Sequence, residues 1–130
     1  MKIIDILRSG EPTLSLEVFP PKTDDLYETV EKATNEISAL KPDFMSVTYG
    51  AAGSTRKYTA QIASNIEKSG VTALAHLTCV AATEETVKNQ VDALKAAGIE
   101  NILALRGDLP EGASGTDNWD IKHASELISV

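Results

Sequence analysis

The sequence predicts an α/β protein of the (β/α)8 TIM-barrel type, present as about four βα units with parallel strands. Four short β-type runs are each followed by a helical pattern, which is typical of parallel strands joined by crossover helices. Each run has one apolar face and one face that becomes polar at its carboxyl end. A doubly wound open sheet has helices on both faces and strands that are apolar on both sides, so the barrel is favoured.

The first elements are a short helix, a strand and a longer helix. The short helix is expected at residues 3–9, packed against one end of the sheet. The first strand lies in TLSLEVF (13–19), and the helix after it has Thr23 as N-cap and Asp24 and Asp25 in its first turn. The apolar face of this helix is predicted from residues at helical spacing, namely Leu26, Val30, Ala33, Ile37 and Leu40.

Three further βα units follow. The helix after the second strand stops at Gly70, and the helix after the third strand runs between a Thr83 cap and Gly98. A fourth helix is expected to begin near Asn118. The strands themselves lie in DFMSVTYG (43–50), TALAHLTC (72–79) and NILALRGD (101–108).

Each strand residue can be assigned to a face because side chains alternate along a strand. The face expected to pack against the helices is predicted to carry Leu14, Leu16, Val18, Met45, Val47, Ala75, Leu77, Leu103 and Leu105. The opposite face is predicted to carry Ser15, Glu17, Ser46, Thr48, His76, Thr78, Ala104 and Arg106.

The length of the chain fits only part of a barrel. A full (β/α)8 barrel typically needs about 250 residues, so we expect residues 1–130 to be a single partial domain, the N-terminal half of a barrel. The final ELISV lies inside an apolar-periodic helix without a C-cap signal, which we interpret as truncation. The first and fourth strands would then present open edges, so we predict a homo-oligomer or capping by another copy.

Composition excludes several classes of partner. Lys+Arg 12 against Asp+Glu 19 gives a net charge of -7, which disfavours nucleic acid and anionic membrane surfaces. The N-terminal residues are too few and too polar for a signal peptide or a membrane span, so we expect a cytoplasmic protein. Cys79 is the only cysteine and is expected to be a small core hydrophobe, and no His/Asp/Glu spacing resembles a metal site.

Glycine placement argues against a nucleotide-binding open sheet. Such a sheet has glycines directly after its first strand, whereas the turn here is FPPKT. GAAGS (50–54), after the second strand, is the nearest approach to a phosphate-binding turn and is weak support for one.

Glu17 is a carboxylate inside an apolar run that ends in Pro20 and Pro21. One interpretation is a barrel-interior carboxylate that forms a salt bridge with a basic neighbour such as Arg106. The other is general acid catalysis, because a carboxyl group partly desolvated by Val18 and its neighbours holds its proton near neutral pH. The two prolines would fix the turn that follows and keep the group in register.

Polar residues gather at one end of the predicted sheet. Glu17, Thr48, His76, Arg106 and Asp108 all fall at the carboxyl ends of the four strands, which favours the catalytic interpretation. Taken alone, His76 fits either a donor to a ligand or a satisfied core histidine. Thr48 alone fits an ordinary β-forming residue.

The strand motifs together resemble those of the methylenetetrahydrofolate reductase family, flavin enzymes of one-carbon metabolism and methionine biosynthesis. SLEVFPPKT, KPDFMSVTYGA, AHLTC and GIENILALRGDLP match in order and at the family's intervals across nearly the whole chain. The resemblance implies a (β/α)8 barrel with noncovalent FAD. It also implies that NADH or NADPH reduces the flavin and leaves, and that the flavin then reduces 5,10-methylenetetrahydrofolate to 5-methyltetrahydrofolate.

The resemblance also implies roles for individual residues. Glu17 would be the acid that promotes opening of the methylene-bridged ring to an iminium. Asp108 would lie near the flavin and the folate pterin, where its charge tunes the flavin and helps to hold the substrate. Arg106 would help to balance the FAD pyrophosphate. The positions that match cofactor contacts are Thr48, His76, Leu105, Arg106, Gly107 and Asp108.

Two other functions remain open from the sequence. One is a half-barrel without catalysis that acts through self-assembly, and the other is a different flavin barrel, such as a proline dehydrogenase-like oxidoreductase. A chain that lacks half of its barrel is expected to be weakly active or inactive on its own. The preference for NADH or NADPH is not readable from these residues.

Overall fold

Four parallel strands form the centre of the molecule. The computed structural model describes residues 1–49, 56–109 and 111–130, so the glycine-rich GAAGS turn lies outside the described residues. The sheet has the order β1-β2-β3-β4, and neighbouring strands are parallel. This confirms the predicted fold class, four βα units of a (β/α)8 barrel. The strands are β1 (Ser15–Val18), β2 (Phe44–Val47), β3 (Thr72–Thr78) and β4 (Asn101–Leu105).

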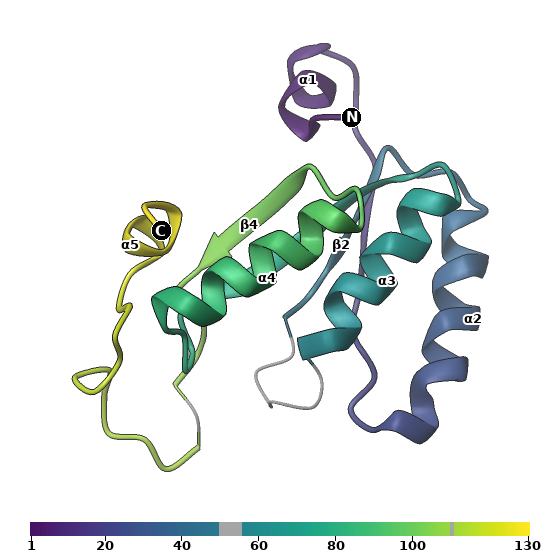
Figure 1. The fold of residues 1–130 in the computed structure, drawn as a ribbon. Helices are drawn as coiled ribbons and strands as arrows, with labels where there is room; N and C mark the ends of the chain where they lie inside the picture. The colour runs from purple at the N-terminus through teal and green to yellow at the C-terminus, as the bar shows by residue number, and fades with distance from the viewer. Residues whose placement is uncertain (50–55, 110) are drawn as a thin grey trace.

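Helices alternate with the strands and cover one face of the sheet (Figure 1). The helix before the first strand lies beyond the amino ends of the strands, where Asn101 Oδ1 accepts the Ile3 N–H at 2.9 Å and Asn101 Nδ2 donates to the Met1 carbonyl at 2.9 Å. The elements are α1 (Ile3–Arg8), η1 (Asp24–Leu26), α2 (Tyr27–Ser38), α3 (Arg56–Lys68), α4 (Glu84–Ala96) and α5 (Ala124–Ile128).

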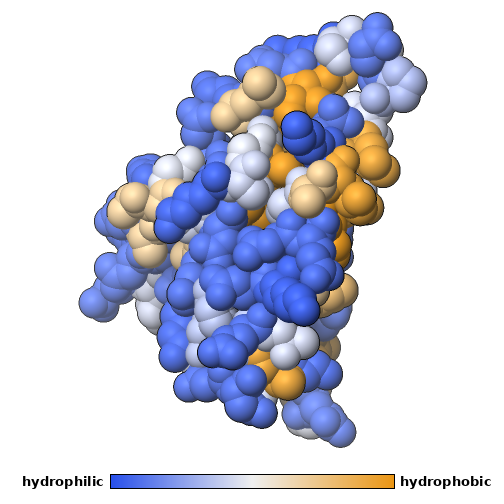
Figure 2. Space-filling model, turned by 90° about the vertical axis from the view of Figure 1, so that its right-hand side faces the viewer, coloured by the Kyte–Doolittle hydropathy of each residue, from blue (hydrophilic) through white to orange (hydrophobic). Residues whose placement is uncertain are grey.

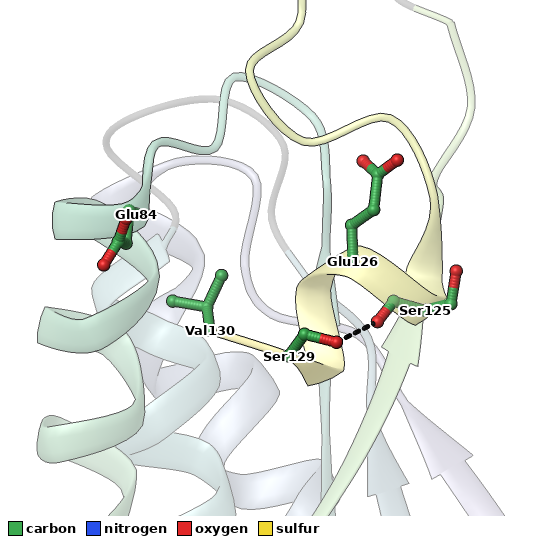
Figure 3. A pocket seen from close by; sticks show the side chains of 5 residues that line it. All are labelled: Glu84, Ser125, Glu126, Ser129 and Val130. Atoms are coloured by element: carbon green, nitrogen blue, oxygen red, sulfur yellow. Dashed lines mark hydrogen bonds between the residues drawn. The ribbon is translucent and has the colours of Figure 1, made fainter.

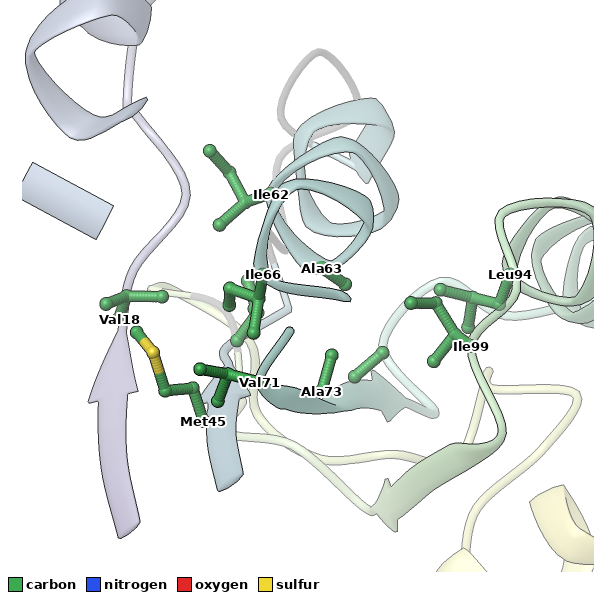
Figure 4. Close-up of a cluster of buried hydrophobic side chains, with 11 residues drawn as sticks. Val18, Met45, Ile62, Ala63, Ile66, Val71, Ala73, Leu94 and Ile99 are labelled. Atoms are coloured by element: carbon green, nitrogen blue, oxygen red, sulfur yellow. The ribbon is translucent and has the colours of Figure 1, made fainter. Parts of the chain in front are cut away.

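The main core lies between the sheet and these helices (Figure 4). Met45, Val47, Ala73 and Ala75 are 0% exposed, and each points from its strand toward the helices. Ile62 of α3 packs against them and is also 0% exposed. The full cluster is Val18, Met45, Val47, Ile62, Ala63, Ile66, Val71, Ala73, Ala75, Leu94 and Ile99.

Helix α2 uses a different face from the one predicted. Val30 and Ile37 pack against the core as expected, but Leu26 and Leu40 are 43% and 71% exposed. Thr34 and Ser38 are buried in their place. Their hydroxyls donate to the carbonyls one turn earlier, at 2.7 and 2.8 Å, so the polar groups are satisfied without water and can be buried. The hydrophobic pattern alone was therefore misleading for this helix.

The predicted helix starts were correct to different degrees. Thr83 caps α4 in a capping box with Thr86, as expected. Thr23 does precede η1, but its side chain makes no capping hydrogen bond. The last helix begins at Ala124 and not near Asn118. A turn in which the Trp119 N–H donates to the Thr116 carbonyl at 2.9 Å occupies the expected start.

The face assignment was wrong for β4. In the observed register Leu77 pairs with Ala104 and His76 pairs with Leu103, and residues in register on parallel strands share a face. Leu103 and Leu105 therefore lie on the face of Glu17 and His76, and Ala104 packs on the helix side. Because Ile102 and Leu103 are both apolar, composition did not distinguish the two registers.

The side of the molecule at the right of Figure 1, where α2 lies, is mostly hydrophilic (Figure 2). Hydrophobic residues in that view gather toward the upper end and one edge. Within the described part of the chain, none of the helices combines the length and the apolarity needed to cross a membrane.

Candidate active site

Glu17, Ser46 and His76 lie on adjacent strands of the sheet, on the face away from the helices. Glu17 pairs with Ser46 in register, and the Ser46 hydroxyl donates to Glu17 Oε2 at 2.8 Å. His76 Nε2 lies 3.6 Å from the same oxygen. This separation exceeds an ordinary hydrogen bond, so the imidazole and the carboxylate face each other without a direct bond.

The three side chains differ in burial. Ser46 and His76 are 8% and 9% exposed, whereas the Glu17 side chain is 46% exposed. Burial lowers the pKa of His76 because it disfavours the charged imidazolium, and the Glu17 carboxylate opposes this shift. His76 is therefore neutral at pH 7, and its contact with Glu17 is not an ion pair between full charges.

Two sequence-based interpretations of Glu17 need correction. The basic neighbour proposed for it was Arg106, but its partners in the structure are Ser46 and His76. The desolvation expected from the adjacent apolar residues is incomplete, because nearly half of the side chain is exposed. Alternation along β1 turns Glu17 away from the apolar layer that buries Val18.

The segment after β4 carries three of the predicted site residues. Arg106 is exposed, and its Nε donates to the Gly107 carbonyl at 3.3 Å. The Cys79 N–H donates to the carbonyls of Leu105 and Arg106, both at 3.1 Å, which ties this segment to the end of β3. Asp108 is exposed. These residues share the carboxyl end of the sheet with Glu17 but make no contact with it among the residues that the structure describes.

Gly107 and Thr78 form a close contact at this end of the sheet. Gly107 has φ +82°, and a Cβ placed on it would lie 2.6 Å from Val80 Cγ2 and 3.0 Å from Thr78 Cβ. Only glycine fits here without strain. Thr78 Oγ1 is buried and has no hydrogen-bond partner within the described ranges. Unpaired buried hydroxyls are uncommon and are typical of sites that interact with another group. The unpaired hydroxyl fits a site that holds a cofactor, whereas the glycine at position 107 is required by packing against Val80 and Thr78.

Thr48 continues β2 at the same end. Its N–H donates to the Val18 carbonyl at 3.1 Å, and its own carbonyl accepts the Thr59 hydroxyl at 3.1 Å. The backbone at Thr48 is thus fixed between β1 and α3. Leu105 pairs with Thr78 in register and shares the open face.

The turn after Glu17 is anchored to α3. Pro21 is fully buried. The Tyr58 hydroxyl donates to Asp24 Oδ1, and Lys57 Nζ lies 3.6 Å from the same oxygen. The Tyr58 hydrogen bond, together with the charge of Lys57, lowers the pKa of Asp24. These contacts hold the segment that leads from Glu17 into α2.

Sequence reasoning missed two features of this site. Ser46 was placed on the correct face but not among the functional residues, and the contact between Tyr58 and Asp24 was not foreseen. Strand register is the signal that identifies Ser46, because the residue paired with a carboxylate on the next strand is its nearest neighbour. The second contact joins residues 34 positions apart, and no local pattern indicates it.

Four hollows lined by described residues contain none of the predicted site residues. One of about 430 Å³ lies between α4 and α5 and is lined by Glu84, Ser125, Glu126, Ser129 and Val130 (Figure 3). It contains two carboxylates and none of the predicted site residues. The site is an open face of the sheet and not an enclosed cavity in this part of the protein.

Comparison with known proteins gives one family. The sequence pattern described as methylenetetrahydrofolate reductase matches residues 2–130. A 5,10-methylenetetrahydrofolate reductase of Pectobacterium carotovorum is 39% identical over 122 residues, which cover 93% of this chain and 40% of that protein. The 5,10-methylenetetrahydrofolate reductase of Salmonella typhimurium is 40% identical over 122 residues, which also cover 93% of this chain and 40% of that protein.

A plant protein is also similar to this chain, over a smaller part of its own length. Methylenetetrahydrofolate reductase (NADH) 1 of Arabidopsis thaliana is 37% identical over 117 residues, which cover 86% of this chain and 20% of that protein. The chain thus spans about 40% of the length of the bacterial relatives it matches. With a family pattern that extends over residues 2–130 and a fold of the expected class, this chain belongs to the methylenetetrahydrofolate reductase family.

Proposed function

We propose that the protein to which these 130 residues contribute reduces 5,10-methylenetetrahydrofolate to 5-methyltetrahydrofolate with NADH or NADPH. The family relationship supports the reaction, since the relatives carry this activity in their descriptions. The observation that carries the proposal is the placement of Glu17. Its half-exposed carboxyl group is held by Ser46 beside the neutral His76, at the carboxyl end of the strands. Active sites of (β/α)8 barrels are built at this end.

Glu17 acts as the general acid in this proposal. It gives a proton to the folate as the methylene-bridged ring opens, and the resulting iminium is the acceptor of the hydride. The neutral imidazole of His76 places no positive charge beside the carboxyl group, and so does not favour its ionised form. Asp108 is exposed at the same end of the sheet, where the substrate or the cofactor can reach it.

The cofactor in this proposal is noncovalently bound FAD, which supplies hydride transfer between the nicotinamide and the folate. Gly107 has no side chain of its own at this end of the sheet, and Thr78, which packs against it, has a buried hydroxyl without a hydrogen-bond partner in the described ranges. Arg106 is exposed and has only a weak backbone contact, so its charge is available to a pyrophosphate. The other residues proposed to hold the cofactor are Thr48, His76, Leu105 and Asp108.

The 130 residues on their own are proposed to bind FAD weakly and to turn over slowly or not at all. Two observations support this proposal. The Glu17 side chain is 46% exposed, and the chain spans about 40% of the length of its bacterial relative. We also propose a cytoplasmic protein that self-associates, because β1 and β4 are both edges of the sheet. Light scattering tests the self-association, and a well-behaved monomer would contradict it.

The decisive experiment separates the two half-reactions in the full-length protein. In Glu17→Gln the reduction of flavin by NAD(P)H should keep its rate, whereas reduction of methylenetetrahydrofolate should slow by about 10²- to 10⁴-fold, the range for loss of a general acid. Anaerobic stopped-flow absorbance in the flavin bands measures both steps. Glu36→Gln is the matched control, because Glu36 lies exposed on α2.

Three results would overturn the proposal. The first is a colourless protein that binds no flavin, which would favour a half-barrel without catalysis. The second is a flavin that an amino acid such as proline reduces and NAD(P)H does not, which would favour a different flavin barrel. The third is a Glu17→Gln protein in which both half-reactions keep their normal rates.

A further inference from the structure

We propose that Ser46 is a positioning residue for Glu17, and that its hydroxyl fixes the carboxyl group so that Oε1 is the oxygen that delivers the proton to the folate. This inference rests on the proposed function, because it gives Glu17 the role of the acid. It adds a residue that the strand motifs did not identify as functional. It also distinguishes between the two oxygens of one carboxyl group.

The contacts of Glu17 are all on one of its oxygens. The Ser46 hydroxyl donates to Oε2 at 2.8 Å, and His76 Nε2 faces the same atom at 3.6 Å. Oε1 has no partner within the described ranges, and the Glu17 side chain is 46% exposed. Oε1 is therefore the oxygen left available to carry the proton to a substrate, whereas Oε2 is occupied as an acceptor.

The Ser46 hydroxyl is well suited to hold this orientation. Ser46 lies in the middle of β2 between Met45 and Val47, which are both 0% exposed, so its backbone is fixed by the core. Glu17 is opposite it in the parallel register of β1. A glutamate side chain has three rotatable bonds, and a half-exposed carboxyl group without such a contact would populate several rotamers. Sites built on strands hold catalytic groups more accurately than sites on loops.

Among the buried serine and threonine residues of the described ranges, Ser46 differs in bonding a carboxyl group. The hydroxyls of Thr34, Ser38 and Thr59 donate to backbone carbonyls, at 2.7, 2.8 and 3.1 Å. Such bonds satisfy the hydroxyl and support a helix or a strand end. The Ser46 hydroxyl donates to the Glu17 side chain instead. Replacing it by alanine removes this contact and leaves the backbone hydrogen bonds of β2 unchanged.

The test combines Ser46 and Glu17 variants in the full-length protein. Ser46→Ala should slow the folate half-reaction about 10-fold, the effect expected from losing one hydrogen bond to the carboxyl group. The flavin half-reaction with NAD(P)H should not change. Ser46→Thr, which keeps a hydroxyl at the same place, should restore most of the folate rate. In a Glu17→Gln background, Ser46→Ala should have no further effect, because residues that act through one another are not additive.

The control is Ser38→Ala, the same chemical change at a buried serine that bonds backbone. It should leave the ratio of the two half-reactions unchanged. If Ser46→Ala slows both half-reactions equally, or slows the folate step as much in the Glu17→Gln background as in the wild type, the positioning role is wrong. If Glu17→Gln slows the folate step and Ser46→Ala does not, the inference alone fails. If Glu17→Gln has no effect on that step, the proposed function fails and the inference with it.

Discussion

The two faces of the sheet differ sharply although the same four strands form both. Over β2 and β3 the helix-side face is closed and apolar, and Met45, Val47 and Ala75 on it are 0% exposed. The open face carries Glu17 with its side chain 46% exposed and Leu103 at 39%. Adjacent residues of one strand thus belong to different environments, because alternation sends Val47 into the core and Ser46 to the opposite face. In this molecule the helix-side face carries the core, and the open face carries the residues that we propose for chemistry.

The strongest test of this division is a pair of large-to-small substitutions. Ile62→Ala, under the helix-side face at 0% exposure, should lower the free energy of unfolding by about 2–5 kcal/mol, the range for buried isoleucine or leucine. Leu103→Ala on the open face should lower it by no more than about 1 kcal/mol, because Leu103 is already 39% exposed. Urea unfolding followed by circular dichroism measures both. Equal losses for the two variants would contradict the division.

The next test concerns the carboxyl end of the open face, where two glycines make a matched pair. Gly107 and Gly112 both have φ +82°, but a Cβ at Gly107 would clash with Val80 and Thr78 while one at Gly112 meets nothing within 4 Å. Alanine in this conformation costs about 1–3 kcal/mol at either position. Gly107→Ala should cost more than Gly112→Ala and should also weaken FAD binding by the full-length protein. Thermal unfolding and flavin titration are the measurements. Equal effects of the two variants would show that Gly107 is a simple turn residue.

The smallest expected effect is a pH dependence specific to the open face. Because burial lowers the pKa of His76 below its ordinary value of 6.5, the folded state binds its proton less readily than the unfolded state. The stability from a neutral His76 is therefore fully present above about pH 6.5 and is lost as the pH falls through the lowered pKa. His76→Asn should remove this part of the pH dependence, measured by urea unfolding between pH 7.5 and about 5.

A second variant sharpens this prediction. The Glu17 carboxylate raises the pKa of His76 and so opposes the effect of burial. Glu17→Gln should lower that pKa further and make the loss of stability in acid steeper. A wild-type protein whose stability does not change over this range, or a Glu17→Gln protein with a shallower slope, would contradict the assignment of a neutral His76.

Sequence patterns predicted the strands well and the side chains between them less well. The four β-type runs, the caps at Thr83 and Gly98 and the polar carboxyl ends were all readable, because they are local features with characteristic residues. The buried face of α2 was only partly right: Val30 and Ile37 pack on the core, but Thr34 and Ser38 are buried in place of the two leucines, because their hydroxyls are satisfied within their own helix. The suggested salt bridge between Glu17 and Arg106 was also wrong. Two residues at the same end of a sheet need not be in contact, and Glu17 contacts Ser46 and His76 instead.

The amino-acid sequence by itself determined the order of strands and helices, the end of the sheet at which polar residues gather and the family motifs that carry Glu17 and Asp108. Alternation and helical periodicity repeat within a few residues, so a single sequence contains them. Only the tertiary structure decided the register that pairs Glu17 with Ser46, the face of β4 and the burial that keeps His76 neutral. These depend on residues about 30 positions apart meeting in space, and their geometry is fixed by packing against the helices.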